Sequence, residues 1–211
     1  MIIGMLGFAS SGKGVCGDIL ESEFSYKKEA FANPVKDAIV AIFGWSREAL
    51  EGGTPESRAW REQDDPWWDS RIKGMTPRYA LQLMGTEAGR NVFDSDLWLY
   101  SLERRLDPMH NYVITDVRFP NEMKFIRALG GKIVRVKRGP EPDYYNDAWF
   151  INTTNWDGTS PQVIAAYPNI HYSEWAWIGF DNLIDHTIMN DGSVGDLQEN
   201  LFIALDKLNK L

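Results

Sequence analysis

The chain has 211 residues, of which 44% are hydrophobic and 25% charged, and its formal net charge is −8. Length and composition are those of a single globular domain, residues 1–211, with a sizeable core. The acidic balance argues against a nucleic-acid polymer as the main ligand, because such proteins usually present a basic face.

The first predicted elements are a strand over residues 1–6, a glycine-bounded loop, and a helix that begins near Gly12. This order is the context that a phosphate-binding P-loop requires. Glycines let backbone N–H groups turn inward, the helix N-terminus adds partial positive charge, and a lysine adds a full one. The residues expected to bind ATP phosphates are Gly7, Ser10, Ser11, Gly12, Lys13, Gly14 and Val15.

The loop departs from the usual pattern directly after its lysine, where a magnesium-binding Ser or Thr is common. Here Gly14 and Val15 follow Lys13. Gly-Lys-Gly is typical of small-molecule kinases that resemble adenylate kinase and hold magnesium largely through water. An ordinary glycine-rich turn is the alternative interpretation of the loop.

The next elements alternate between the sheet and helical regions. We expect a strand over 26–31, and a helix through Ile42 with Asn33 as its N-cap and Pro34 in its first turn. Residues 45–75 are polar, rich in Trp and interrupted by Gly and Pro, so they predict short helices outside the sheet. A helix capped by Thr76 should run to about Arg90, and another should cover 95–106.

The second half predicts strands over 112–115, 132–137 and 183–189, with helices over 119–129 and 193–208. Strands that alternate with helices imply a parallel sheet covered on both faces. The predicted fold is therefore a three-layer α/β P-loop NTPase fold with a helical substrate-binding insertion at 45–75. Cys16, in the first helix, is expected to be a buried small residue.

Residues 139–182 form a long excursion without clear periodicity. Such a stretch is either functional or disordered, and its many aromatic residues, including Trp156, argue against disorder. We expect an ordered, lid-like insertion over the strand ends. Packing against a partner subunit is the alternative.

Charged residues at the end of the strand over 112–115 are candidates for the chemistry. Ligands bind at the carboxyl ends of parallel strands, where Asp116 could reach magnesium directly or through water. Arg118 could clamp a phosphate with two hydrogen bonds. A purely structural ion pair between Asp116 and Arg118 is the alternative.

Four further residues could meet a second substrate. Lys36 lies in the first turn of a helix, and Arg78 and Gln82 share a helix face that suits a phosphate and a base edge. Arg61 shares a face with Arg58 in the polar insertion and could close over a substrate. For Lys36, Arg78 and Gln82, a solvated helix surface is the alternative interpretation.

Several segments together resemble the deoxynucleoside monophosphate kinases of bacteriophages, which transfer the γ-phosphoryl group of ATP to a dNMP. The resemblance covers most of the chain in order, with 45–75 and 139–170 matched only loosely. The matching segments are 7–13, 31–38, 76–86, 94–98, 114–122, 171–174 and 188–192.

The resemblance implies roles for the matched positions. ATP and Mg2+ would be required, with Lys13, Arg78, Asp116 and Arg118 as catalytic residues and Asp116 toward the metal. Gly85 would allow close approach of the substrate, and Ser173 would contact a nucleotide. The substrate-binding residues implied at matched positions are Lys36, Arg78, Gly85, Thr86, Trp98, Arg118, Glu122 and Ser173. Arg61 and Gln82, the candidates named above from their helix faces, complete the expected set.

The partners expected are a small-molecule dNMP and neither a nucleic-acid polymer nor a membrane; a homodimer is left open. No targeting segment is recognised, and the single cysteine fits a reducing cytoplasm, that of the host if the chain is phage-encoded. Alternatives are a kinase for a ribonucleotide or a coenzyme precursor, and a nucleotide-binding module without transfer activity. A phage structural or DNA-packaging protein is disfavoured by the acidic charge.

Overall fold

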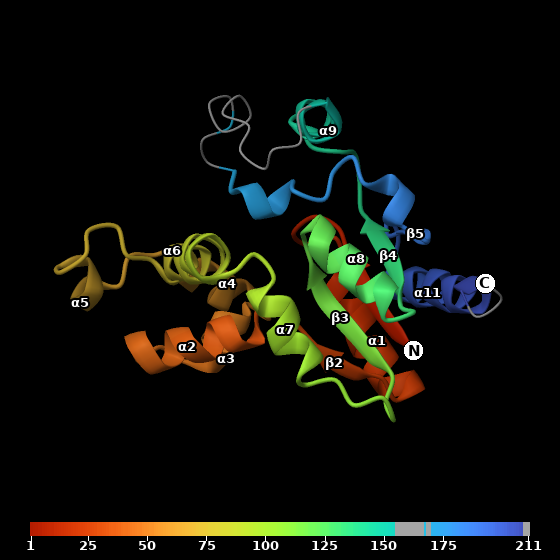
Figure 1. Cartoon of the computed structure of the whole chain (residues 1–211), viewed down its shortest axis with the longest axis horizontal. Helices are drawn as coiled ribbons and strands as arrows, with labels where there is room; N and C mark the ends of the chain where they lie inside the picture. Colours follow the sequence, from red (N-terminus) through yellow and green to blue (C-terminus); the bar gives the residue numbers. More distant parts are fainter. Residues whose placement is uncertain (155–166, 168–169, 209–211) are drawn as a thin grey trace. The chain divides into compact units, whose positions relative to one another are not determined.

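A five-stranded parallel sheet organises the first of two units in the computed structural model of the chain (Figure 1). The structure describes residues 1–154, 167 and 170–208. The first unit combines Met1–Ala30 with Leu106–Leu211, and the second is Phe31–Arg105. The expectation of one domain over 1–211 stays a prediction.

The strand order of the sheet is β2-β3-β1-β4-β5, and every neighbouring pair is parallel. The strands are β1 (Ile2–Leu6), β2 (Lys27–Glu29), β3 (Tyr112–Val117), β4 (Lys132–Lys137) and β5 (His186–Met189). The central strand β1 has β3 on one side and β4 on the other. The carboxyl ends of β1 and β3 therefore meet at one edge of the sheet, where ligands bind in open parallel sheets.

Helices cover both faces of this sheet. Ile3 and Met5 of β1 pack in one core with Leu20 of helix α1 and with apolar residues of helix α11. Gly4 points to the other face, where an added Cβ would lie 2.7 Å from Ile126 of helix α8. Figure 1 shows α8 in front of the sheet and α1 behind it. The predicted three-layer α/β fold is confirmed, with α1 (Lys13–Phe24), α8 (Pro120–Ala128) and α11 (Val194–Leu208).

Two further observations concern the first unit. Cys16 is fully buried, as predicted, and burial raises the pKa of its thiol to about 12. In the described part of the chain, no helix combines the length and apolar character needed to cross a membrane.

The second unit consists of helices around an aromatic core. Ile39, Trp45 and Leu50 are buried there. The indole of Trp68 donates to the carbonyl oxygen of Phe43 at 3.1 Å. The elements are α2 (Asn33–Phe43), α3 (Arg47–Glu51), α4 (Pro55–Arg61), α5 (Pro66–Asp69), α6 (Pro77–Gln82), the π-helix η1 (Leu83–Phe93) and α7 (Leu97–Glu103). The prediction of short helices over 45–75 is confirmed.

Helix starts agree with the sequence at one position and differ at another. Thr76 caps α6, since its Oγ1 accepts from the backbone N–H of Tyr79 at 3.0 Å. Asn33 is not the N-cap of α2; Ala32 holds that position. Instead, the side-chain oxygen of Asn33 accepts from Nη2 of Arg47 at 3.1 Å, a contact with the next helix, α3.

Other element boundaries also differ from the predictions. The helix after Thr76 changes to π geometry from Leu83 to Phe93, the second strand is limited to Lys27–Glu29, and the last begins only at His186. Helix α9 (Tyr145–Thr154) occupies part of the stretch that lacked periodicity. The rest of the predicted lid-like region includes 155–166 and 168–169, with Trp156, which lie outside the described residues.

Candidate active site

The loop between β1 and α1 has the backbone shape of a phosphate-binding loop. Gly7 and Gly12, at its two ends, have φ angles of +140° and +106°, which side chains disfavour. A Cβ at Gly7 would lie 2.3 Å from the carbonyl oxygen of Val136, and one at Gly12 would lie 2.5 Å from Nδ2 of Asn190. Both positions need glycine. The loop can therefore close in front of the α1 N-terminus, whose N–H groups favour an anion.

The ammonium group of Lys13 lies back across this loop. Its Nζ donates to the carbonyl oxygens of Gly7 and Phe8 at 2.7 and 2.6 Å. Burial, and then the nearby guanidinium of Arg118, lower the pKa of Lys13 to about 8, although nearby carboxylates oppose the shift. The positive charges of Lys13 and Arg118 thus repel each other, and a bound polyanionic ligand would reduce that repulsion.

Ser11 supplies a hydroxyl within the loop. The residue is 4% exposed, and its Oγ has no hydrogen-bond partner among the described residues. Its carbonyl oxygen accepts from Nδ2 of Asn190 at 2.8 Å, which ties the loop to the end of β5. An orphaned hydroxyl at this place fits a ligand with acceptor oxygens, such as a phosphate.

The two residues after Lys13 carry no hydroxyl for a metal. Gly14 and Val15 are both exposed at the start of α1. A Cβ at Gly14 would meet no atom within 4 Å, so packing in the protein does not explain the glycine. The space beside Gly14, where P-loops commonly have Ser or Thr, is therefore open.

Asp116 and Arg118 lie at the carboxyl end of β3, beside the end of β1. The backbone at this point is held by Glu122, which is 2% exposed. Its Oε2 accepts from the N–H groups of Arg118 at 2.7 Å and Phe119 at 3.0 Å. Glu122 therefore fixes the position from which the Arg118 side chain extends.

The Arg118 guanidinium reaches a segment more than fifty residues further along the chain. Its Nη1 forms an ion pair with Glu174 and donates to Oγ of Ser173 at 3.4 Å. Burial alone would lower the pKa of Arg118, but the carboxylates of Glu174, Asp116 and Glu122 together raise that pKa, so the side chain stays charged. Ser173 Oγ also lies 2.8 Å from Nδ1 of His171. The predicted lid segment thus contacts the strand end.

Aromatic side chains connect the same segment to the loop. The ring of Phe8 lies 5.1 Å from that of Trp177 and 6.1 Å from that of Tyr144, measured between centroids. Arg135 is 7% exposed, and its guanidinium lies over the Trp177 ring. It donates to both carboxylate oxygens of Glu141 at 2.6 and 2.7 Å. This packing supports the loop from the side of residues 139–182.

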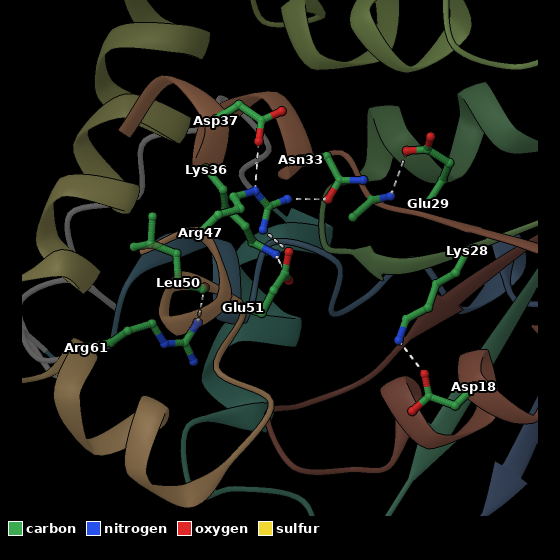
Figure 2. A network of polar contacts seen from close by, with 11 residues as sticks. Asp18, Lys28, Glu29, Asn33, Lys36, Asp37, Arg47, Leu50, Glu51 and Arg61 are labelled. Atoms are coloured by element: carbon green, nitrogen blue, oxygen red, sulfur yellow. Dashed lines mark hydrogen bonds and ion pairs between the residues drawn. The ribbon is translucent and has the colours of Figure 1, made fainter. Parts of the chain in front are cut away.

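In the second unit, the predicted substrate residue Lys36 forms an ion pair with Glu51, and Figure 2 displays this network. Glu51 also accepts from Arg47, whose Nε donates to Asp37 at 2.8 Å. Arg61 donates to the carbonyl oxygen of Leu50 at 3.4 Å. Both cations thus contact helix α3: Lys36 pairs with the side chain of its last residue, Glu51, and Arg61 bonds to its backbone at Leu50.

The other predicted substrate residues of this unit lie on α6, η1 and α7. Arg78 forms an ion pair with Glu62. The indole of Trp98 donates to the carbonyl oxygen of Gly85 at 2.7 Å. A Cβ at Gly85 would make only ordinary contacts, with Val35 at 3.8 Å, so the protein's own packing does not require glycine there.

Gln82 and Thr86 are both partly buried, on either side of the junction between α6 and η1. Close to this junction is an apolar cavity of about 330 Å³. Glu87 contributes the only charged side chain to its wall, which is lined by Ile39, Phe43, Ala80, Leu83, Met84, Glu87, Ala88 and Val92. The second unit thus offers cations at α3 and an apolar hollow at η1.

The structure therefore brings the predicted residues together in two groups. The first unit gathers Gly7, Ser10, Ser11, Gly12, Lys13, Gly14, Val15, Asp116, Arg118, Glu122 and Ser173; the second holds Lys36, Arg61, Arg78, Gln82, Gly85, Thr86 and Trp98. Sequence reasoning missed Glu174 and Arg47 as partners in these groups. Arg47 and Glu51 are four residues apart on one helix, a spacing that could have indicated their ion pair.

Over the described ranges, no group of three or more His, Cys, Asp and Glu side chains is arranged to hold a metal ion. A single carboxylate at a strand end suits Mg2+, which keeps several waters and is often shared with substrate phosphates. Asp116 beside the loop fits that pattern, and a dedicated protein cage is not required.

Comparison with known proteins shows an extended match to a viral protein. A protein of Acanthamoeba polyphaga mimivirus, named as a deoxynucleotide monophosphate kinase, is 32% identical over 152 residues, 65% of this chain and 74% of that protein. The chain belongs to the deoxynucleotide monophosphate kinase family. The deoxynucleoside-5'-monophosphate kinase of Escherichia phage T5 is 47% identical over 55 residues, 25% of this chain and 22% of that enzyme. The resemblance read from the sequence is confirmed.

Other comparisons are more distant, and no family model matches the chain. Among solved structures, a dephospho-CoA kinase from Campylobacter jejuni has a TM-score of 0.48 at 12% identity, covering 99% of this chain and 97% of that one. A shikimate kinase from Aquifex aeolicus has a TM-score of 0.44 at 11% identity, covering 98% and 97%.

Proposed function

We propose that this chain transfers the γ-phosphoryl group of ATP to a deoxynucleoside monophosphate, giving a deoxynucleoside diphosphate for viral DNA synthesis. One observation carries the proposal in this family member: the Lys13 ammonium lies on the carbonyl oxygens of Gly7 and Phe8 in the P-loop, where the charge of Arg118 also acts on it. Two cations beside a loop with an orphaned hydroxyl suit a triphosphate.

On the ATP side, loop amides from Gly7 to Val15 and the Lys13 ammonium bind the phosphates. Arg118 neutralises charge on the phosphoryl group in transit, and Glu122 keeps its backbone in place. Asp116 would hold Mg2+, directly or through water, and the ion would supply further charge neutralisation. Catalysis then rests on positioning and electrostatics, as expected for a loose phosphoryl-transfer transition state.

On the acceptor side, we assign binding to the set of residues expected from the sequence. Its members are Lys36, Arg61, Arg78, Gln82, Gly85, Thr86, Trp98, Arg118, Glu122 and Ser173. The acceptor phosphate has its second pKa at about 6 and is largely a dianion at neutral pH. It can therefore attack without a general base, and the residues need only bind and orient it.

Water must be kept from the reacting phosphates, because ATP hydrolysis would compete with transfer. Residues 139–182 are the segment proposed for this task. Contacts of Phe8 with Trp177 and Tyr144 connect that segment to the loop. Deuterium exchange that is unchanged by a bisubstrate dinucleotide analogue would argue against closure.

The test is ADP formation from ATP and Mg2+ with each dNMP and NMP offered singly. Lys13→Ala should abolish turnover, and Lys124→Ala, which removes an exposed lysine from α8, should not change it. Turnover confined to dNMPs supports the proposal. Turnover confined to ribonucleotides would replace it with another small-molecule kinase.

The Gly14-Val15 departure favours one other candidate, a nucleotide-binding module without transfer activity. Tight ATP binding with no turnover on any monophosphate would establish that candidate. Introducing a hydroxyl with Val15→Thr, two positions after the lysine, should then change little, whereas in an active kinase it should alter the Mg2+ dependence of turnover.

A further inference from the structure

We propose that Glu174 is an internal competitor for the ATP triphosphate: its carboxylate holds the Arg118 guanidinium until ATP displaces it. The inference rests on the proposed function, because it assumes that Arg118 binds an ATP phosphate. It assigns to Glu174 a role in setting ATP affinity.

The contact itself is the first observation. Glu174 ends the short 3-10 helix η2 (Tyr172–Glu174), and its carboxylate forms an ion pair with Nη1 of Arg118. The same nitrogen donates to Oγ of Ser173 at 3.4 Å. A carboxylate on a guanidinium makes the charge-assisted contact that a phosphate oxygen would make. The Glu174 carboxylate and an ATP phosphate would therefore compete for the same donor, the Arg118 guanidinium.

Electrostatics extend the contact to the P-loop. Glu174 acts on Lys13 as well as on Arg118: it opposes the lowering of the Lys13 pKa by burial and contributes to the raised pKa of Arg118. Its charge therefore offsets both cations proposed to bind ATP. A bound triphosphate would bring several negative charges to the same place. The carboxylate and the triphosphate repel each other, so the side chain must leave as ATP arrives.

The backbone that carries Glu174 is held firmly by its neighbours. Trp175 is 1% exposed, and Asn152 donates to the carbonyl oxygens of Trp175 at 3.1 Å and Ile178 at 2.8 Å. The rings of Tyr172 and Trp175 pack edge to face with centroids 4.6 Å apart. A change of the Glu174 side-chain rotamer is therefore enough to release Arg118, without a local rearrangement of this backbone.

A structural ion pair is the competing explanation, and it predicts the opposite result. Partly exposed ion pairs contribute little to stability, and the Arg118 backbone is already fixed by Glu122. If Glu174 served to align Arg118 for ATP, removing its charge would weaken binding. If it competes with ATP, removing its charge tightens binding.

The experiment measures binding of a non-hydrolysable ATP analogue, without acceptor, to the wild-type chain and to Glu174→Gln. The amide keeps the shape of the side chain and removes its charge. We expect the Kd to fall roughly tenfold. Inorganic triphosphate should gain as much as the nucleotide, because the competition is at the phosphates. Glu199→Gln, an exposed carboxylate on α11, is the matched control for net charge and should leave the Kd unchanged.

A double-mutant cycle places the effect on the ion pair. In an Arg118→Gln background, Glu174→Gln should lower the Kd much less than in the wild type, because only its effect on Lys13 and its repulsion of the triphosphate remain. Thermal melting of each variant checks that it is folded. Glu174→Asp keeps the charge but shortens the side chain, and its Kd should lie between those of the wild type and Glu174→Gln. An unchanged or higher Kd for folded Glu174→Gln overturns the inference. Absence of turnover on any dNMP would overturn the proposed function without altering this binding result.

Discussion

The P-loop residue Phe8 packs on Trp177, with their ring centroids 5.1 Å apart. Phe8 is only partly buried, whereas Trp177 is 2% exposed. The loop that is proposed to bind ATP is therefore packed against Trp177, a residue of the predicted lid-like region. Phosphate binding and the packing of this region should be coupled.

Trp177→Ala should lower the free energy of unfolding by about 3–5 kcal/mol, because it leaves a cavity beneath the loop. Phe8→Ala should cost less, about 1–2 kcal/mol, because the ring is only partly buried. Urea unfolding followed by circular dichroism measures both. Trp67→Ala, at a position 55% exposed, is the control and should cost less than about 1 kcal/mol. Equal losses at positions 177 and 67 would contradict the packing account.

ATP affinity should fall as pH rises through 8. The pKa of Lys13 in the nucleotide-free protein is lowered to about 8, mainly by burial, so the ammonium loses its proton above that pH. ATP itself keeps its charge there, since a phosphate's second pKa is about 6. Calorimetric titration between pH 7 and 9.5 should give weaker binding and proton uptake at the alkaline end.

Lys13→Arg is the control for this pH dependence, because arginine stays charged throughout the range. Its affinity should be lower than that of the wild type at pH 7 and should change little up to pH 9.5. A wild-type affinity that is flat over the range would show that the Lys13 charge does not limit binding.

Glu122→Gln should reduce both stability and turnover. The Glu122 carboxylate accepts from the N–H groups of Arg118 and Phe119, and charged acceptors of this kind contribute about 1.5–3 kcal/mol each. We expect a loss of about 1–3 kcal/mol in unfolding free energy, because the amide oxygen still accepts. Since Arg118 is then less well placed, kcat should fall more than the KM for ATP rises. A stable variant with unchanged kcat would remove Glu122 from the positioning of Arg118.

Lys36→Met should raise the KM for the dNMP roughly tenfold and leave that for ATP unchanged, if Lys36 meets the acceptor phosphate. The ammonium forms an ion pair with Glu51 in this structure, so the acceptor must compete with that carboxylate. Lys73→Met is the matched control, because Lys73 is an exposed lysine of the same unit that pairs with Asp69 at 2.9 Å. Equal effects of the two variants would contradict a role for Lys36.

Local patterns predicted much of the fold. The strand Lys132–Lys137 has the bounds expected from the sequence, and the helix after the P-loop begins at Lys13. Thr76 caps its helix because capping depends on a side chain and a backbone N–H three residues away. Each of these features is decided within a few neighbouring residues.

Features that depend on distant residues were missed. Helix α9 has no clear apolar face, and one of its buried residues, Asn152, bonds to backbone of residues 175 and 178. Asn33 was expected to cap a helix, but Arg47 uses its side chain. The change to π geometry at Leu83 has no signal that we recognise in the sequence.

The candidate site divides in the same way. The loop and Lys13 could be read from a short motif, and Asp116 and Arg118 from the end of an apolar strand. Glu174 could not be identified as the partner of Arg118, because 56 residues separate them and only the folded chain joins them. The sequence patterns thus identified the candidate phosphate-binding cations Lys36 and Arg118, but not the carboxylates of Glu51 and Glu174 that form ion pairs with them.

The most direct test of the central claim follows the phosphoryl group itself. ATP labelled at the γ-phosphate is incubated with Mg2+, the chain and one dNMP at a time, and the products are separated. The account predicts label in a dNDP for at least one dNMP, abolished by Lys13→Ala and retained by Lys124→Ala. Label found only in inorganic phosphate, or only in a ribonucleoside diphosphate, would contradict it.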